Sequence, residues 1–164
     1  MSIAQAMLGE FELEAATTRK FLERIPQDKL TWRPHEKSHT AGELGLHIAI
    51  VPGFVAKFAL VDQSPVPGPS EMFRQPAKVS DILTSHEESL ATVREILPTL
   101  SDEHLMTNWS AMIDGKAVAT MPKVMALRVI MLNHWIQHRG QLGVFLRLIG
   151  AKVPASYGPS GDEG

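Results

Sequence analysis

The sequence contains no cysteine among its 164 residues. This absence excludes disulfide bonds, thiolate metal sites and cysteine nucleophiles. An excess of either charge is also missing, because 16 Lys and Arg residues against 18 Asp and Glu residues leave a formal net charge of -2. A surface so close to neutral lacks the basic patch that binds nucleic acid or anionic membranes, so we expect neither as a partner.

Targeting signals and long hydrophobic runs are absent as well. The first ten residues show no basic segment followed by a long apolar one, so no secretory signal peptide is expected. No apolar run reaches the roughly 20 residues that a membrane-spanning helix needs. The length suits one compact domain with its own core. These features predict a single cytoplasmic domain over residues 1–164.

Helical periodicity is the main feature that the sequence does contain. Apolar residues recur every three or four positions in four stretches, residues 2–25, 40–61, 80–97 and 122–149. Prolines end the first and third stretches, and Gly150 suits the position that follows the fourth. We therefore expect four helices, of which the second begins with the capping box Thr40-Ala41-Gly42-Glu43.

The segments between these stretches carry turn residues. Residues 64–69, with three prolines and a glycine, predict a loop, and residues 101–121 are irregular. Within the irregular stretch, Asp114-Gly115 is a turn signal that would close a short hairpin. No segment otherwise indicates a sheet. The prediction is an all-α fold, a four-helix bundle with irregular loops and a short hairpin before the fourth helix.

The fourth helix has polar residues where a core face is expected. The positions spaced by three or four residues along it are Val124, Leu127, Met131, His134, His138, Gln141, Phe145 and Leu148. Buried polar groups cost free energy unless they find partners, so three in succession suggest a site. His134 and His138 are spaced i, i+4, which places both imidazoles on one helix face, where they can bind one divalent metal.

A third histidine strengthens this interpretation. His47 occupies an equivalent inward position on the second helix, between Leu44 and Val51. Three histidines without cysteine would leave one or more coordination positions open, as in catalytic sites, and zinc and nickel both suit imidazole. The alternative from the residues alone is that His47 is a core histidine hydrogen-bonded to a backbone carbonyl.

Other polar residues have structural interpretations beside functional ones. His86 lies on the inward face of the third helix, and we expect a core histidine there and not a ligand. Glu43 is explained by the capping box, although it would also be the best-placed general base. Gln141 would bond either a metal-bound water or a neighbouring backbone, and Arg139 points away from the histidines, toward a carboxylate elsewhere. The aromatic residues Trp32, Trp109 and Tyr157 would either wall a cleft or cover an end of the core.

Several motifs together resemble the DinB superfamily, a family of damage-inducible four-helix bundles. They are Trp32-Arg33-Pro34-His35-Glu36-Lys37-Ser38, Ala41-Gly42-Glu43-Leu44 ahead of His47-Ile48-Ala49, His134-x-x-x-His138-Arg139-Gly140-Gln141-Leu142, and Gly150-x-x-Val153-Pro154-x-x-Tyr157-Gly158-Pro159-Ser160. The resemblance covers most of the chain and is weakest at residues 62–80 and 101–121. It implies one divalent metal ion, zinc or nickel, bound by His47, His134 and His138.

The resemblance also implies classes of activity. Relatives include S-transferases and isomerases that use bacillithiol or mycothiol, and others are described as metal-dependent hydrolases. The expected function is therefore a metal-dependent enzyme acting on a small molecule, either a transferase with a low-molecular-weight thiol as co-substrate or a hydrolase. The sequence identifies no catalytic residues beyond the metal ligands. The alternative is a stress-related metal-binding or interaction protein without turnover.

Two further expectations concern assembly and the C-terminal tail. The fourth helix carries a second apolar stripe, Leu132, Trp135, Leu142, Leu146 and Ile149, interrupted only by Arg139. A bundle helix normally needs one apolar face, so a second one should meet either another helix or another subunit. The resemblance implies a homodimer, which favours the subunit. The tail after Gly150 contains apolar and turn residues, and we expect it to fold back with Tyr157 packed on the bundle.

Overall fold

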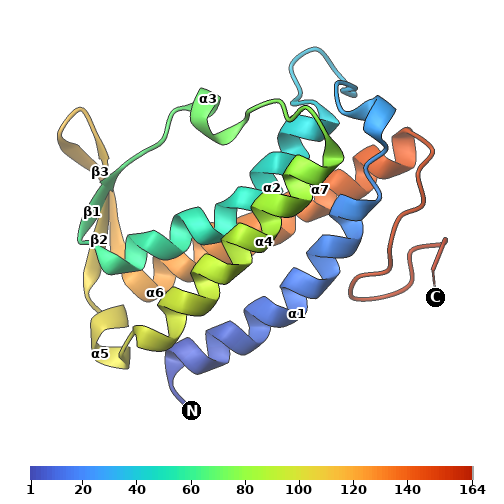
Figure 1. Ribbon diagram of the computed structural model, residues 1–164. Helices are drawn as coiled ribbons and strands as arrows, with labels where there is room; N and C mark the ends of the chain where they lie inside the picture. The colour runs from blue at the N-terminus through green and yellow to red at the C-terminus, as the bar shows by residue number, and fades with distance from the viewer. Residues whose placement is uncertain (164) are drawn as a thin grey trace.

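The computed structural model describes residues 1–163, and four long helices dominate it (Figure 1). The helices are α1 (Ile3–Glu23), α2 (Ala41–Ala56), α3 (Pro69–Met72), α4 (Val79–Ile96), α5 (Asp102–Leu105), α6 (Lys123–Ala126) and α7 (His134–Leu148). Short 3-10 turns are η1 (Gln27–Lys29), η2 (Lys57–Leu60) and η3 (Leu97–Thr99), and the π-helix η4 (Leu127–Asn133) joins α6 to α7. Three strands complete the fold, β1 (Gln63–Pro65), β2 (Asn108–Ile113) and β3 (Lys116–Pro122).

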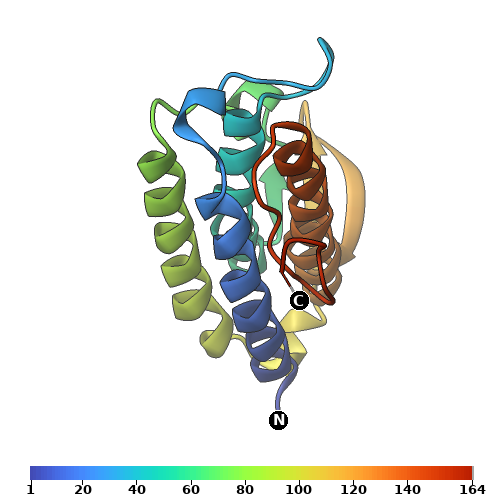
Figure 2. The ribbon, with the colours of Figure 1, turned by 90° about the vertical axis from the view of Figure 1, so that its right-hand side faces the viewer.

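The four predicted helices are present, close to their predicted bounds. The capping box of Thr40 and Glu43 begins α2, as the sequence predicted. The Ser2 hydroxyl caps α1 in the same way. Gly150 follows α7 with a φ of 78°, the left-handed conformation of a helix-ending glycine. In the view of Figure 2, α1, α2, α4 and α7 run lengthwise and pack side by side. Apolar residues from all four helices meet in one core.

The expectation of an all-α fold is wrong at one end of the bundle. The predicted hairpin forms as β2 and β3, whose turn residues Asp114 and Gly115 both have positive φ. Strand β1 then pairs with β2 in parallel, within the segment predicted as a loop, to give a three-stranded sheet in the order β1-β2-β3. Pro122, where the fourth helical stretch was expected to begin, is instead the last residue of β3. The prolines around β1 indicate a loop and not a strand, but proline is tolerated at the edge of a sheet, where β1 lies.

The π-helix η4 shifts the inward face of the fourth helical stretch. Within it, Leu127, Met131 and Leu132 are buried, and after it the buried positions are Trp135, Arg139, Leu142 and Leu146. A π turn contains one more residue than an α turn, so the inward face moves by one position. The second apolar stripe is therefore the core face of α7. Of the two alternatives for this stripe, it therefore meets other helices of the same chain and does not serve as a subunit interface.

Helix α2 is the central helix of the bundle and is buried on nearly all sides. By length and composition alone, Ala41–Leu60 could cross a membrane, which corrects the expectation that no segment is apolar enough. In this fold 72% of that window is buried inside the protein, as expected for a core helix. The histidine of α2 therefore points into an environment with little water.

The C-terminal tail folds back over α1 and α7, as predicted (Figure 2). Polar contacts hold it. Arg24 bonds Glu163, Arg147 pairs with Asp162, and the Tyr157 hydroxyl donates to Glu14 Oε1 at 2.8 Å. The Tyr157 ring itself remains 73% exposed, so the residue is anchored by its hydroxyl and not packed into the core.

Candidate metal centre

His47, His134 and His138 come together in the structure. His47 lies in the middle of α2, and the other two lie on the first turns of α7. One ring nitrogen from each lies within 4.8 Å of the others, and the Nε2 atoms of His134 and His138 are 2.7 Å apart. Bonds from zinc to imidazole nitrogen are about 2.0–2.1 Å, so small ring rotations would let one ion bind all three.

Hydrogen bonds on the far side of two rings orient them toward this centre. Nδ1 of His47 donates to the Met72 carbonyl at 3.2 Å, and Nδ1 of His138 donates to Gln141 Oε1 at 2.7 Å. Carbonyl oxygens only accept, so each Nδ1 carries the proton and each Nε2 keeps its lone pair. This is the tautomer that metal-binding histidines use, with a second group fixing the ring.

Buried nitrogens without a partner occur at the centre and at the nearby His86. Among the described residues, the buried side-chain nitrogen and oxygen atoms without a hydrogen-bond partner all belong to histidines: His47 Nε2, His134 Nδ1 and both ring nitrogens of His86. Buried polar atoms in folded proteins nearly always have partners. For His47 Nε2, a cation bound between the three histidines would be that partner.

Burial keeps the three imidazoles neutral. It lowers the pKa of His47 to about 3, with the nearby His138 as a further cause. Burial is also the main cause that lowers the pKa values of His134 and His138. A neutral imidazole is the form that binds metal, so all three side chains are ready to act as ligands near pH 7.

One contact fixes α7 against α2 beside the histidines. Pro52 has no N–H, so the carbonyl of Ile48 lacks the helical partner it would otherwise have. The indole Nε1 of Trp135 donates to that carbonyl at 2.8 Å, and both groups are buried. Ile48 follows His47 and Trp135 follows His134, so this bond sets the position of one ligand helix relative to the other.

The segment after α3 covers the outer side of the centre. The ring of Phe73 stacks between His39 and His47, with centroid distances of 3.5 and 4.1 Å. The preceding residue, Met72, supplies the carbonyl that holds His47. Sequence analysis missed both residues, because nothing in the spacing of residues 62–80 connects them to a histidine in another helix.

A cavity of about 350 Å³ opens beside His47 and His134. Helix α2, strand β2 and the segment between β1 and α4 form its walls, which include Trp109 and Phe73. Of the aromatic residues proposed as walls of a cleft, Trp109 therefore has that role. Trp32 instead packs edge-on against Phe145, and Tyr157 contacts Glu14.

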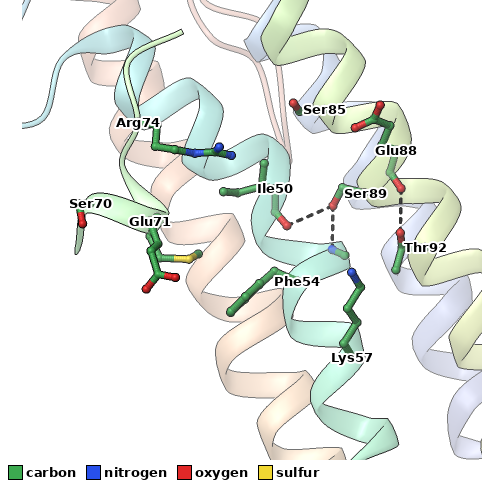
Figure 3. Close-up of a pocket in the computed structure, with 12 residues that line it drawn as sticks. Ile50, Phe54, Lys57, Ser70, Glu71, Arg74, Ser85, Glu88, Ser89 and Thr92 are labelled. Atoms are coloured by element: carbon green, nitrogen blue, oxygen red, sulfur yellow. Dashed lines mark hydrogen bonds between the residues drawn. The ribbon is translucent and has the colours of Figure 1, made fainter. Parts of the chain in front are cut away.

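A second, larger hollow of about 610 Å³ lies between α2, α4 and the α3 segment (Figure 3). Lys57, Arg74, Glu71 and Glu88 give it mixed charge, and its lining does not include the three histidines. At its base, Ser89 Oγ accepts from the N–H of Gly53 at 2.7 Å. A Cβ at Gly53 would lie 2.8 Å from Ser89 Cα, so glycine is required where α2 and α4 touch. The hollow is therefore separate from the three-histidine group, and its base is formed by the close contact of α2 with α4.

The remaining predicted residues have structural roles. His86 is fully buried near Trp135 and lies outside the three-histidine group, as expected of a core histidine. Glu43 accepts from the N–H of Thr40 in the capping box. Gln141 Oε1 accepts from His138 Nδ1 and so orients that ring. Arg139 pairs with Glu14, a carboxylate on α1, on the opposite side of α7 from the histidines.

The family model of the DinB family matches residues 1–164. The chain belongs to the DinB family. It is 26% identical over 157 residues to the uncharacterized protein YrdA of Bacillus subtilis (strain 168), a match that covers 95% of this chain and 89% of YrdA. Among known structures it is similar to a DinB-like protein from Bacillus cereus ATCC 10987, with a TM-score of 0.74, 21% identity and coverage of 93% and 97% of the two chains.

A second structural relative is the DinB-like protein YjoA of Bacillus subtilis. Its TM-score is 0.71 at 21% identity, over 94% of this chain and 99% of YjoA. These likenesses establish the DinB-like fold. The three histidines that the resemblance implied as ligands lie together in this chain, in an arrangement that could hold a metal ion.

Proposed function

We propose that this DinB-family protein is a metal-dependent enzyme acting on a small molecule, with one zinc or nickel ion bound by His47, His134 and His138. The supporting observation is the convergence of three neutral imidazoles around a buried His47 Nε2 that has no other partner. When bound, an ion with three protein ligands keeps a position open for water or substrate, polarises that group and lowers its pKa.

The residues around the centre supply orientation and shielding. Gln141 fixes the ring of His138, the Met72 carbonyl fixes that of His47, and Phe73 covers His47 from outside. Excluding water from such a site strengthens its electrostatic interactions. The adjacent cavity gives a small molecule room beside His47 and His134, which favours an enzyme over a metal site with only a structural role.

The cavity lining favours thiol transfer over hydrolysis. Of the residues described by the structure, no carboxylate lines this cavity, and Glu43 is engaged in the cap of α2. The nucleophile must therefore lose its proton without a carboxylate base beside it. A thiol, with an ordinary pKa near 8.5, does so more readily than water. The proposal places transfer from a low-molecular-weight thiol first and metal-dependent hydrolysis second.

Metal analysis and a paired activity screen test this function. Protein purified without a histidine tag should contain close to one zinc or nickel ion per chain. Metal-loaded protein should transfer small thiols to an activated aryl halide, or hydrolyse nitrophenyl esters, and chelation should abolish the reaction. Turnover that survives complete metal removal would contradict the proposal. A metal whose removal unfolds the chain, with no turnover in either assay, would support the non-catalytic alternative.

The proposal includes a cytoplasmic homodimer. Its interface would be the exposed face of α7 and not the second apolar stripe, which is buried in the core. Val144 and Leu148 are 59% and 60% exposed and share one outward face of α7, and Met125 and Val129 are exposed on the helical stretch before it. We expect light scattering at micromolar concentration to give a dimeric mass, and Val144→Glu with Leu148→Glu to give a monomer. A monomeric mass for the unmodified chain would contradict the dimer. No nucleic-acid or membrane partner is expected.

A further inference from the structure

The cavity beside the histidines is lined almost entirely by apolar side chains. Apart from His47 and His134, every residue that lines it is apolar. The apolar lining comprises Val51, Phe54, Val55, Phe58, Pro65, Val66, Pro67, Pro69, Met72, Phe73, Trp109, Ala111 and Ile130. The polar groups of this cavity are therefore the histidine rings at one end, which is the end where the metal is proposed to bind.

The one apolar wall residue with a hydrogen-bonding side chain has its donor already engaged. Trp109 stacks on Phe58 with a centroid distance of 4.6 Å, and its Nε1 donates to Ser64 Oγ at 3.1 Å. Trp109 is 3% exposed, so it is a fixed part of the wall. A ligand in this cavity would find no side-chain donor or acceptor away from the histidines. Charged or strongly polar groups would lose their hydration there without compensation.

We infer that the substrate is an uncharged molecule with an apolar alkyl or aryl tail, whose reacting group lies against His47 and His134. The tail would occupy the space between α2, β2 and the segment after β1. This inference rests on the proposed function for the reacting end, whereas the tail depends only on the cavity. Nucleotides, amino acids and sugar phosphates do not match this lining.

The cavity volume sets the length of the tail. About 350 Å³ holds on the order of ten water-sized groups, since water occupies about 30 Å³ in the liquid. Val66 lines the cavity and is 46% exposed, so the cavity meets solvent at that residue. A tail longer than about ten heavy atoms would extend past it into water and gain little more from burial.

Two probe series test the tail and the metal separately. For zinc-loaded protein, calorimetry with n-alkyl hydroxamates should show affinity rising about fourfold per methylene up to a plateau, because each buried methylene contributes about 0.8 kcal/mol. For metal-free protein, n-alkanols from butanol to decanol should quench or shift tryptophan fluorescence with a similar dependence on chain length. Hydroxamates that bind equally at all chain lengths, together with alkanols that show no dependence, would overturn the inference and leave the metal site standing. A chain-length dependence with alkanols in a protein that binds no metal would support the cavity and contradict the proposed function.

Variants of the wall give a second, directional test. Ala111→Phe adds a ring inside the cavity and should lower affinity for octyl probes at least tenfold, with the plateau at a shorter chain. Phe58→Ala should move the plateau to longer chains. Val118→Phe is the matched control, because Val118 is 56% exposed on neighbouring strand β3 and outside the lining. Circular dichroism and zinc stoichiometry confirm that each variant is folded. Unchanged plateaus in both folded cavity variants would overturn the inference.

Discussion

Replacing His138 by alanine is expected to lower affinity for zinc or nickel by more than a hundredfold while the four long helices remain. The variant leaves His47 and His134 as the remaining ligands, too few for tight binding of a catalytic ion. Helix content should be retained, because His138 is only half-buried and its ring contacts are with other centre residues. Competition with a chromophoric chelator measures the affinity, and circular dichroism measures the helices.

Two further variants test whether His138 is a metal ligand and His86 is not. Gln141→Leu removes the group that orients His138 without removing a ligand, and should weaken binding by about 10–100-fold. His86→Leu keeps the volume of a buried histidine outside the centre and should leave the affinity unchanged. Full metal occupancy in His138→Ala, or loss of metal in His86→Leu, would show that the ligands are misassigned.

The three histidines could be predicted from the sequence because local features, the helical spacing and a capping box, determine where they lie on their helices. The spacing of His134 and His138 places both on one face of any helix, and the capping box fixes where the helix of His47 begins. The contact between α2 and α7 could not be derived in this way. It depends on the indole of Trp135, which donates to the Ile48 carbonyl the hydrogen bond that Pro52 cannot donate. Pro52 and Trp135 are 83 positions apart in the chain. Phe73 and Met72 were missed for the same reason, since only tertiary structure brings them to His47.

The errors in the fold prediction have physical causes of the same kind. The inward face of the fourth helical stretch was extrapolated with constant α-helical spacing, and the π turn at η4 moves it by one residue. Gln141 and Leu148 were therefore placed inward although both are exposed, and Trp135 and Arg139 were placed outward although both are buried. Residue types alone do not signal a π-helix. The parallel pairing of β1 is likewise a long-range contact that three residues with a proline do not encode locally.

The segment His138-Arg139-Gly140-Gln141 shows how one short motif serves two sides of a helix. His138 and Gln141 lie together at the metal centre. Arg139 points to the opposite side, where its Nη1 donates to Glu14 Oε2 at 2.5 Å and to Thr18 Oγ1 at 3.2 Å. The guanidinium also lies over the rings of Phe21 and Tyr157. The motif thus joins α7 to α1 and to the tail while presenting a ligand toward α2.

Replacing Arg139 by methionine is therefore expected to destabilise the protein by about 3–5 kcal/mol. The side chains of Arg139 and Glu14 are 3% and 10% exposed, and removing Arg139 leaves the buried Glu14 charge with the neutral Tyr157 hydroxyl in place of a cation. That loss is a large share of the roughly 5–15 kcal/mol that stabilises a typical domain. Urea unfolding followed by circular dichroism measures the change.

The double variant Arg139→Met with Glu14→Leu separates the cost of an unpaired charge from the loss of packing. Apolar replacement of a whole buried ion pair is often close to neutral, so the double variant should recover most of the stability lost in Arg139→Met. It should not recover the anchoring of the tail, because Tyr157 loses its acceptor, and proteolysis after Gly150 should become faster. Arg147→Met is the control, since its pair with Asp162 is largely exposed and should contribute at most about 1 kcal/mol. A double variant as unstable as the single one would show that Arg139 acts through packing over Phe21 and Tyr157 and not through its charge.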